Sequence, residues 1–258
     1  MKALVHVRPA SKPHSGLRPR RGGAVPIWTV LVLLAFASLS GVIALAGCGG
    51  GGGGPVDAKA VLAKTSANMK RIVGFHFVYK VNAPQKATPS SGLDIKGIQG
   101  DVNAQGSMTA TIDVTESGIA LQLKFVAIGD TQYIQNPLSG AWQSVGVDQS
   151  PVGKLNLNAG TIQILDKIVD PTYVADESIG GTATHHIKGT VSAAEVAAVV
   201  GAVSVTGTFP TDIWVGVKDN YVYQVQIAGA ATSTDDPKTV RVITLSNLNK
   251  PVTVKAPI

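Results

Sequence analysis

The chain has 258 residues and a formal net charge of +6, with 22 Lys and Arg residues against 16 Asp and Glu residues. Six of the basic residues and none of the acidic ones lie before Cys48, so the chain from Cys48 onward is neutral and offers no basic surface for nucleic acid. Cys48 is the only cysteine, which excludes a disulfide framework, and a domain of about 200 residues can bury a core sufficient to hold it together.

Residues 1–47 have the three parts of a secretory signal. Basic residues occur from Lys2 to Arg21, an apolar run extends from Ala24 to Leu45, and small residues precede Cys48. The order Leu-Ala-Gly-Cys ending at Cys48 matches the bacterial lipobox, in which the thiol of the cysteine receives a diacylglycerol before cleavage on its N-terminal side. The sequence therefore predicts that Cys48 becomes the lipidated N-terminus of the mature protein.

The apolar run is also long enough for an uncleaved transmembrane helix, since about 20 residues span a bilayer. Pro26, Ser38, Ser40 and Gly41 disfavour that alternative, and the lipobox disfavours it further. The Arg20-Arg21 pair leaves open whether export follows the general secretory route or the twin-arginine route.

An unbroken glycine run, residues 49–54, follows Cys48 and ends at Pro55. Its composition is typical of a flexible tether. It also fits the G-x-G-x-x-G pattern, but without the strand and helix that a dinucleotide site requires. We expect a signal peptide at 1–47, a lipidated cysteine and tether at 48–55, and a single domain at 56–258.

The first half of this domain predicts one helix followed by strands. Asp57 is a suitable N-cap, and apolar side chains at helical spacing extend to Ile72, before Gly74 ends the helix. Three alternating runs follow, and the short turns between them favour an antiparallel meander. Their apolar members are Phe75, Phe77, Tyr79 and Val81; Met108, Ala110, Ile112 and Val114; and Ile119, Leu121, Leu123 and Phe125.

The second half predicts helices between strands. Residues 161–169 have helical spacing and stop before Pro171, whose ring disfavours helix at the preceding residue. Ser192 to Glu195 form a capping-box pattern that opens a helix rich in Ala and Val. The order helix, strands, helices, strands predicts an α+β fold, an antiparallel sheet with helices on one face. The later strands are expected at 185–191, 213–217, 221–227 and 240–246.

The chain carries no G-x-S-x-G elbow, S-x-x-K, H-E-x-x-H or P-loop motif. His185 and His186 are adjacent in a predicted strand, so they point to opposite faces and cannot easily share a metal ion; His76 stands alone. The acidic pairs at 176–177 and 235–236 lie in turn-like sequence and are interpreted as solvated. We expect no enzymatic activity, no metal and no cofactor.

One face of the predicted sheet is built from Met, Ala, Ile, Val and Gly, and only 5% of all residues are aromatic. The composition of this face leaves two interpretations open. Because proteins pack densely, the face can belong to an ordinary aliphatic core. Alternatively, helices with few large rings leave an apolar cavity between themselves and the sheet, suited to a lipid.

Nine short stretches carry a family resemblance through their order and spacing, together with the lipobox. They are Asp57-Ala58-Lys59, Gly106-Ser107-Met108, Phe125-Val126, Asp130-Thr131-Gln132-Tyr133, Ala141-Trp142, Ile187-Lys188-Gly189-Thr190-Val191-Ser192, Ile213-Trp214-Val215, Thr244-Leu245-Ser246 and Lys250-Pro251-Val252. Over nearly all of 56–258 the chain resembles the LppX/LprA/LprF/LprG family of actinobacterial cell-envelope lipoproteins. It departs from the family at 154–158, a segment more polar than expected, where the resemblance says least about ligand size and entry.

The resemblance implies a curved antiparallel sheet, a half-barrel, with helices packed on its concave face around a hydrophobic cavity. Family members bind multi-acylated lipids or glycolipids and are linked to moving them from the inner membrane toward the outer envelope. Met108 matches a family position that projects into the cavity, and Ala110 and Ile112 share its face. A one-residue register error would turn the remaining candidates outward; these are Val78, Leu121, Leu123, Phe125 and Val215.

The leading hypothesis is a monomeric lipid carrier, held by diacylglyceryl-Cys48 at the periplasmic face of the cell membrane. Its expected partners are the membrane and an acylated lipid or glycolipid, and a membrane transporter is left open as a further one. The alternative is a non-enzymatic envelope scaffold with a solid core. A hydrolase of envelope lipids is the third hypothesis, disfavoured because the catalytic motifs are missing.

Overall fold

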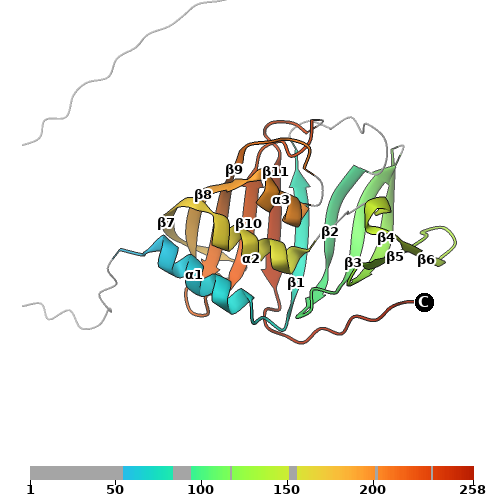
Figure 1. Cartoon of the computed structure of the whole chain (residues 1–258), viewed down its shortest axis with the longest axis horizontal. Coiled ribbons are helices and arrows are strands. Elements are labelled where there is room, and N and C mark those ends of the chain that lie inside the picture. The colour runs from blue at the N-terminus through green and yellow to red at the C-terminus, as the bar shows by residue number, and fades with distance from the viewer. Residues whose placement is uncertain (1–54, 84–93, 117, 151–155, 201–202, 234) are drawn as a thin grey trace, which may run out of the picture. The chain divides into compact units, whose positions relative to one another are not determined.

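The computed structural model describes residues 55–83, 94–116, 118–150, 156–200, 203–233 and 235–258 (Figure 1). Cys48, the predicted signal segment and the glycine run lie outside these residues. The described residues belong to one compact unit, Gly52–Ile258. No helix among them is long and apolar enough to cross a membrane.

One antiparallel sheet of 11 strands dominates the domain, in the order β6-β5-β4-β3-β2-β1-β11-β10-β9-β8-β7. The sheet is open, because β6 and β7 are its two edges and do not pair with each other. The strands are β1 Gly74–Asn82, β2 Asp94–Asn103, β3 Met108–Glu116, β4 Ile119–Ile128, β5 Thr131–Gln135, β6 Trp142–Val145, β7 Val169–Ile179, β8 Thr182–Ser192, β9 Thr208–Gly216, β10 Val222–Ala228 and β11 Val240–Ser246.

Three α-helices gather on one face of the sheet, in front of β7 to β11 in Figure 1. They are α1 Ala58–Met69, α2 Leu157–Lys167 and α3 Ala193–Val200, and a short 3-10 turn, η1, covers Val147–Gln149. The helices approach the sheet most closely over β7, β8 and β9. This confirms the predicted α+β class, with a large open sheet and its helices on one side.

The first helix begins where the sequence predicts. The Asp57 carboxylate accepts hydrogen bonds from the amides of Lys59, at 3.0 Å, and Ala60, at 3.2 Å, so it satisfies donors that no helical carbonyl can reach. Leu62 and Met69 of the predicted stripe are buried in the core. The helix ends at Met69, before Ile72, the last residue of that stripe.

The second helix differs from the prediction at both ends. It begins at Leu157, because the Asn156 side chain accepts a hydrogen bond from the Ala159 amide at 3.0 Å and caps it. It ends at Lys167, and Ile168 is already extended. The predicted range 161–169 was therefore about one turn too late, because periodicity locates a stripe better than it locates a cap.

The third helix begins at the predicted capping-box sequence. The Ser192 hydroxyl accepts the Ala194 amide at 3.3 Å and donates to the Glu195 carboxylate at the start of α3. At the crossing of α2 and α3, a Cβ on Gly160 would lie 2.6 Å from the Val199 side chain and 2.9 Å from the Ala198 carbonyl oxygen. Only a residue without a side chain allows this approach.

The alternating runs at the start of the domain form β1, β3 and β4 as predicted, and the later runs form β8 to β11. Four strands, β2, β5, β6 and β7, were not predicted. In β2 and β7 the alternation is broken by register shifts, at 95–97 in β2 and at 169–172 and 173–175 in β7. A bulge moves later side chains to the other face, so the period of two is lost in the sequence.

Candidate functional site

The inner face of the sheet, the side turned to the helices, forms a continuous apolar surface. Pairing sets its rows: Met108 lies between Val102 and Ala127, and Ala110 lies between Gly100 and Phe125. One row further, Ile112 lies between Ile98 and Leu123. The helices meet this surface in one core cluster, through side chains that include Leu62 of α1, Ile164 of α2 and Val199 of α3.

Seven of the eight candidate ligand residues lie on this inner face. Six belong to β3 and β4, and Val215 belongs to β9, across the sheet. Leu121 is partly buried and packs against the core, whereas the other six are buried. The residues are Met108, Ala110, Ile112, Leu121, Leu123, Phe125 and Val215.

Val78 lies on the opposite, outer face. It stands between Phe77 and Tyr79, both buried, and it pairs with Gln99 of β2 and Thr244 of β11. Because successive side chains of a strand alternate between faces, Val78 turns away from the surface that contains the other seven. We therefore leave it out of the candidate lipid surface.

Several inner-face residues were not among the candidates. The strand pairing also places on the inner face Phe77 in β1, Ile98 in β2 and Ile243 in β11. Phe77 and Ile243 follow the alternation that revealed their strands, so that signal could have found them. Ile98 lies in β2, whose bulge and two glycines hid the strand itself.

The inner-face side chains are almost completely covered. Ile112, Phe125 and Val215 are 0% exposed, and Ala110, the most accessible of the buried candidates, is 8% exposed. Contact with acyl chains would therefore require the helices and the sheet to separate locally, or a lipid to replace the side chains and segments that now cover this face.

A polar group closes one end of the apolar surface. Arg241, on β11, pairs with Val81 and Ile227 and is 6% exposed, the one charged side chain in the buried class among the described residues. Its guanidinium forms an ion pair with Asp235 and donates to the Gly229 carbonyl at 3.1 Å. Asp235 also accepts the amides of Ala231 and Thr232, so it is not the solvated residue that the sequence predicted.

Two opposing influences set the pKa of Asp235. Burial raises it, but the Arg241 hydrogen bond and charge, together with the amides of Ala231 and Thr232, lower it more strongly. The net pKa lies below the usual range, and the carboxylate stays ionised at neutral pH. Burial raises the pKa of the neighbouring Tyr79 hydroxyl, in spite of the opposing charge of Arg241.

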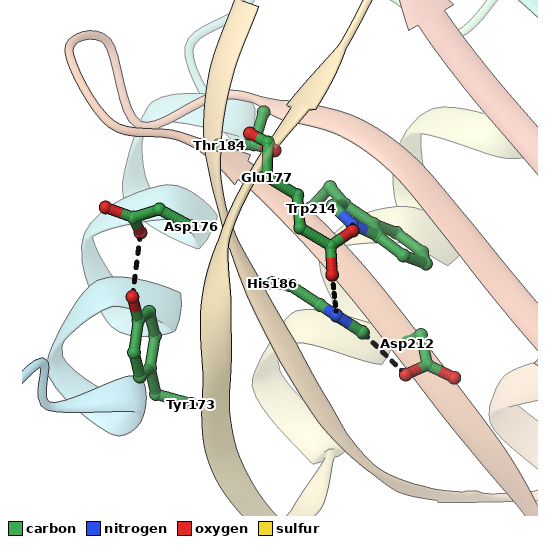
Figure 2. A network of polar contacts seen from close by, with 7 residues as sticks. All are labelled: Tyr173, Asp176, Glu177, Thr184, His186, Asp212 and Trp214. Carbon is green, nitrogen blue, oxygen red and sulfur yellow. Dashed lines mark hydrogen bonds and ion pairs between the residues drawn. The ribbon is translucent and has the colours of Figure 1, made fainter. Parts of the chain in front are cut away.

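The outer face carries a polar network on β7, β8 and β9 (Figure 2). The His186 ring lies between two carboxylates, with Nδ1 at 2.9 Å from Glu177 and Nε2 at 2.7 Å from Asp212. It stacks on Trp214, with ring centroids 4.4 Å apart, and the Trp214 indole donates to Glu177 at 2.8 Å. The pKa of Glu177 is lowered, first by the Trp214 hydrogen bond and then by His186.

His185 belongs to a separate pair. Its Nδ1 lies 2.5 Å from Asp176, which also accepts the Tyr173 hydroxyl at 3.0 Å. His185 pairs with Val215 and His186 pairs with Trp214, so their rings lie on opposite faces as predicted. Asp176 and Glu177 are thus exposed but paired with histidines. Among the residues that the structure covers, no group of three or more His, Cys, Asp or Glu side chains could hold a metal ion.

The model of the LppX_LprAFG lipoprotein family matches residues 57–254. The lipoarabinomannan carrier protein LprG of Mycobacterium tuberculosis is 26% identical over 206 residues, covering 76% of this chain and 84% of that protein. LprF of Mycobacterium bovis, whose name describes a diacylated glycolipid transporter, is 25% identical over 260 residues, covering 93% of this chain and 95% of that protein.

Solved structures agree on the fold. The crystal structure of LprF from Mycobacterium bovis superposes with a TM-score of 0.60 at 23% identity, covering 80% of this chain and 99% of that one. Lipoprotein LppX from Mycobacterium tuberculosis gives 0.54 at 18% identity, covering 77% and 100%. At these identities the structures show a shared fold.

Proposed function

We propose that this chain, which belongs to the LppX_LprAFG lipoprotein family, binds acylated lipids or glycolipids on its inner face and carries them across the cell envelope. The relatives named as lipoarabinomannan carrier and glycolipid transporter support a lipid carrier. The observation that carries the proposal to this chain is the broad apolar surface formed by β1 to β4 and β9 to β11.

Acyl chains are the ligand chemistry that this surface suits. Most of its side chains are aliphatic or aromatic, and each buried methylene would contribute about 0.8 kcal/mol. An acyl chain of ordinary length therefore needs no charged partner to bind. Arg241 and Asp235 are already paired with each other, and they leave the rest of the surface to apolar contacts.

The remaining parts of the proposal concern where the domain works. Cys48 carries a diacylglyceryl group after residues 1–47 are removed, and residues 48–55 tether the domain at 56–258. The domain then stays, as a monomer, at the periplasmic face of the cell membrane. Its tether lets it meet lipid leaving that membrane.

The second candidate is an envelope scaffold with a solid core. The near-complete burial of Ile112, Phe125 and Val215 favours it, because a rigid interior without space could not admit an acyl chain. The paired carboxylates and histidines of the outer face would then serve a protein partner.

A transfer assay separates the two. Donor vesicles contain a fluorescent diacylated glycolipid, acceptor vesicles contain none, and the compact unit from Pro55 onward is added in solution. The carrier proposal predicts transfer that rises with protein concentration. It also predicts a loss in Ala110→Trp, which adds bulk on the inner face, but not in Thr109→Trp, which adds it on the exposed side of the same strand.

Absence of transfer by the wild-type protein would favour the scaffold. Release of free fatty acid during the assay would instead revive the hydrolase hypothesis. Unfolding midpoints of both tryptophan variants show whether each is folded before its transfer rate is compared.

A further inference from the structure

A pocket of about 350 Å³ opens at one end of the sheet, outside the candidate residues for acyl chains. Residues from three segments line it: the β7–β8 hairpin, the β9–β10 turn and the end of β11. Antiparallel pairing brings these segments to the same end of the sheet. The volume falls at the lower end of the range of about 300–1,000 Å³ found for small-molecule sites.

The walls of the pocket are held by hydrogen bonds. The Tyr223 hydroxyl donates to the Asp219 carboxylate at 2.8 Å, and the other oxygen of that carboxylate accepts the Tyr221 amide at 3.2 Å. From α1, the Asn68 side chain donates to the Asp219 carbonyl at 3.0 Å and fixes the turn. Asp219 and Tyr223 therefore face the pocket in a fixed arrangement.

Gly216 is required for this arrangement. A Cβ at this position would lie 2.1 Å from the Asp219 carboxylate and 2.8 Å from the Tyr223 ring. No real Cβ atom tolerates such contacts, so both side chains rest against bare backbone. The site depends on a glycine in a buried strand position, where a side chain would otherwise be expected.

The lining selects against anionic ligands. Two phenol rings, Tyr221 and Tyr223, stand with the hydroxyls of Thr182 and Ser246, the Asn247 amide and the Asp219 carboxylate. Of the described residues that line the pocket, none is Lys, Arg or His. An anion such as a phosphate would meet a carboxylate and no cation, whereas a sugar offers hydroxyls to the polar groups and C–H groups to the rings.

We propose that this pocket binds a neutral sugar residue, with its hydroxyls on Asp219 and Asn247 and its C–H face against Tyr221. The sugar can come from a glycolipid headgroup or from a free glycan. The site does not depend on acyl-chain binding, so it stands or falls separately from the carrier proposal.

The test is a ligand-observed NMR titration of the full chain in a detergent without a sugar headgroup, because an alkyl glycoside would compete. The probes are methyl glycosides of a neutral hexose and a neutral pentose, a hexose phosphate, and the headgroup glycan of a glycolipid with and without its acyl chains. We expect at least one neutral glycoside to bind about tenfold more tightly than the hexose phosphate. Binding of the headgroup glycan without its acyl chains means that the sugar alone is recognised.

Variants locate the binding. Ser246 is exposed and lines the pocket, so Ser246→Trp fills it with little cost to folding and should abolish sugar binding. Tyr223→Phe removes the hydroxyl that holds Asp219 and should weaken binding about tenfold. Tyr173→Ala, a tyrosine outside the pocket, should leave the affinity unchanged.

Three results would overturn the proposal: no neutral glycoside binds, the phosphate binds more tightly, or Ser246→Trp binds as the wild type does. Binding of the acylated glycolipid alone, with no affinity for any free sugar, would also overturn it, although the carrier proposal would then survive.

Discussion

Arg241 is the residue whose burial is most costly without its partner. The ion pair with Asp235 lies in the low-dielectric end of the inner face, where removal of one charge leaves the other uncompensated. Asp235 also holds the amides of Ala231 and Thr232, so one carboxylate stabilises both the arginine and the loop before β11.

We predict that Asp235→Asn destabilises the domain by about 3–5 kcal/mol at neutral pH. Because the pKa of Asp235 is lower in the folded state than in the unfolded chain, its contribution is full above the usual aspartate range and lost as the pH falls below it. Urea unfolding measures the free energy of unfolding of Asp235→Asn and of the wild type. The difference between the two should shrink as the pH is lowered from neutral to acid. Asp130→Asn, exposed in the β4–β5 turn, is the control; a constant difference across pH would contradict the prediction.

On the outer face, Trp214 contributes one hydrogen bond beyond its packing on His186. Trp214→Phe keeps an aromatic ring but removes the donor to Glu177, and we expect a small loss in the free energy of unfolding. It should also raise the pKa of Glu177 toward its ordinary value, which carboxylate NMR chemical shifts measure. Trp142→Phe, in edge strand β6, is the matched control; an unshifted Glu177 would show that the indole is not its main partner.

At the scale of elements, the crossing of α2 and α3 depends on Gly160. Glycine inside a helix ordinarily costs about 1 kcal/mol relative to alanine, so Gly160→Ala would stabilise an isolated helix. Here the new methyl group collides with Val199 and the Ala198 carbonyl, and we expect a net destabilisation of about 1–3 kcal/mol.

Thermal unfolding measures this effect directly. Gly146→Ala is the control, because Gly146 has a φ of −69° and a Cβ there would meet nothing within 4 Å. A stabilised Gly160→Ala variant would mean that α2 and α3 can move apart without loss.

Elements with regular patterns could be predicted from the sequence, and irregular ones could not. The Asp57 cap, the Ser192 capping box and the runs that form β1, β3 and β4 are local signals that tertiary structure left intact. β7 was missed because two register shifts and Pro171 break its alternation, and β2 because a bulge and two glycines do so. These strands are fixed by pairing, β2 with β1 and β3 and β7 with β8, and carry no regular alternation of their own.

The candidate surface, too, could be predicted from the sequence only in part. Strand alternation placed Met108, Ala110 and Ile112 on one face, but it could not say which face meets the helices, so Val78 was assigned to the wrong side of the sheet. Asp235 was misjudged because it lies in a loop and its partner, Arg241, lies six residues further on in β11. No local sequence pattern indicates such a pair. Neither the pocket at Tyr223 nor the need for glycine at 216 has a signal in a single sequence.

For the whole molecule, the central question is whether the closed apolar interior opens to acyl chains. The family and its named carriers support opening, while the 0% exposure of Ile112, Phe125 and Val215 describes a closed interior. A carrier needs both states, because cargo must enter and leave. The energetic requirement is that buried methylene groups outweigh the cost of separating helices from sheet.

Native mass spectrometry of the chain expressed in an actinobacterial host, with Cys48→Ala to keep it free of its own lipid, tests this most directly. The account predicts a population whose added mass matches an acylated lipid or glycolipid, lost in Met108→Trp on the inner face and kept in Thr111→Trp on the outer face, with both variants folded. Lipid-free protein alone, or equal lipid occupancy in the two variants, would contradict it.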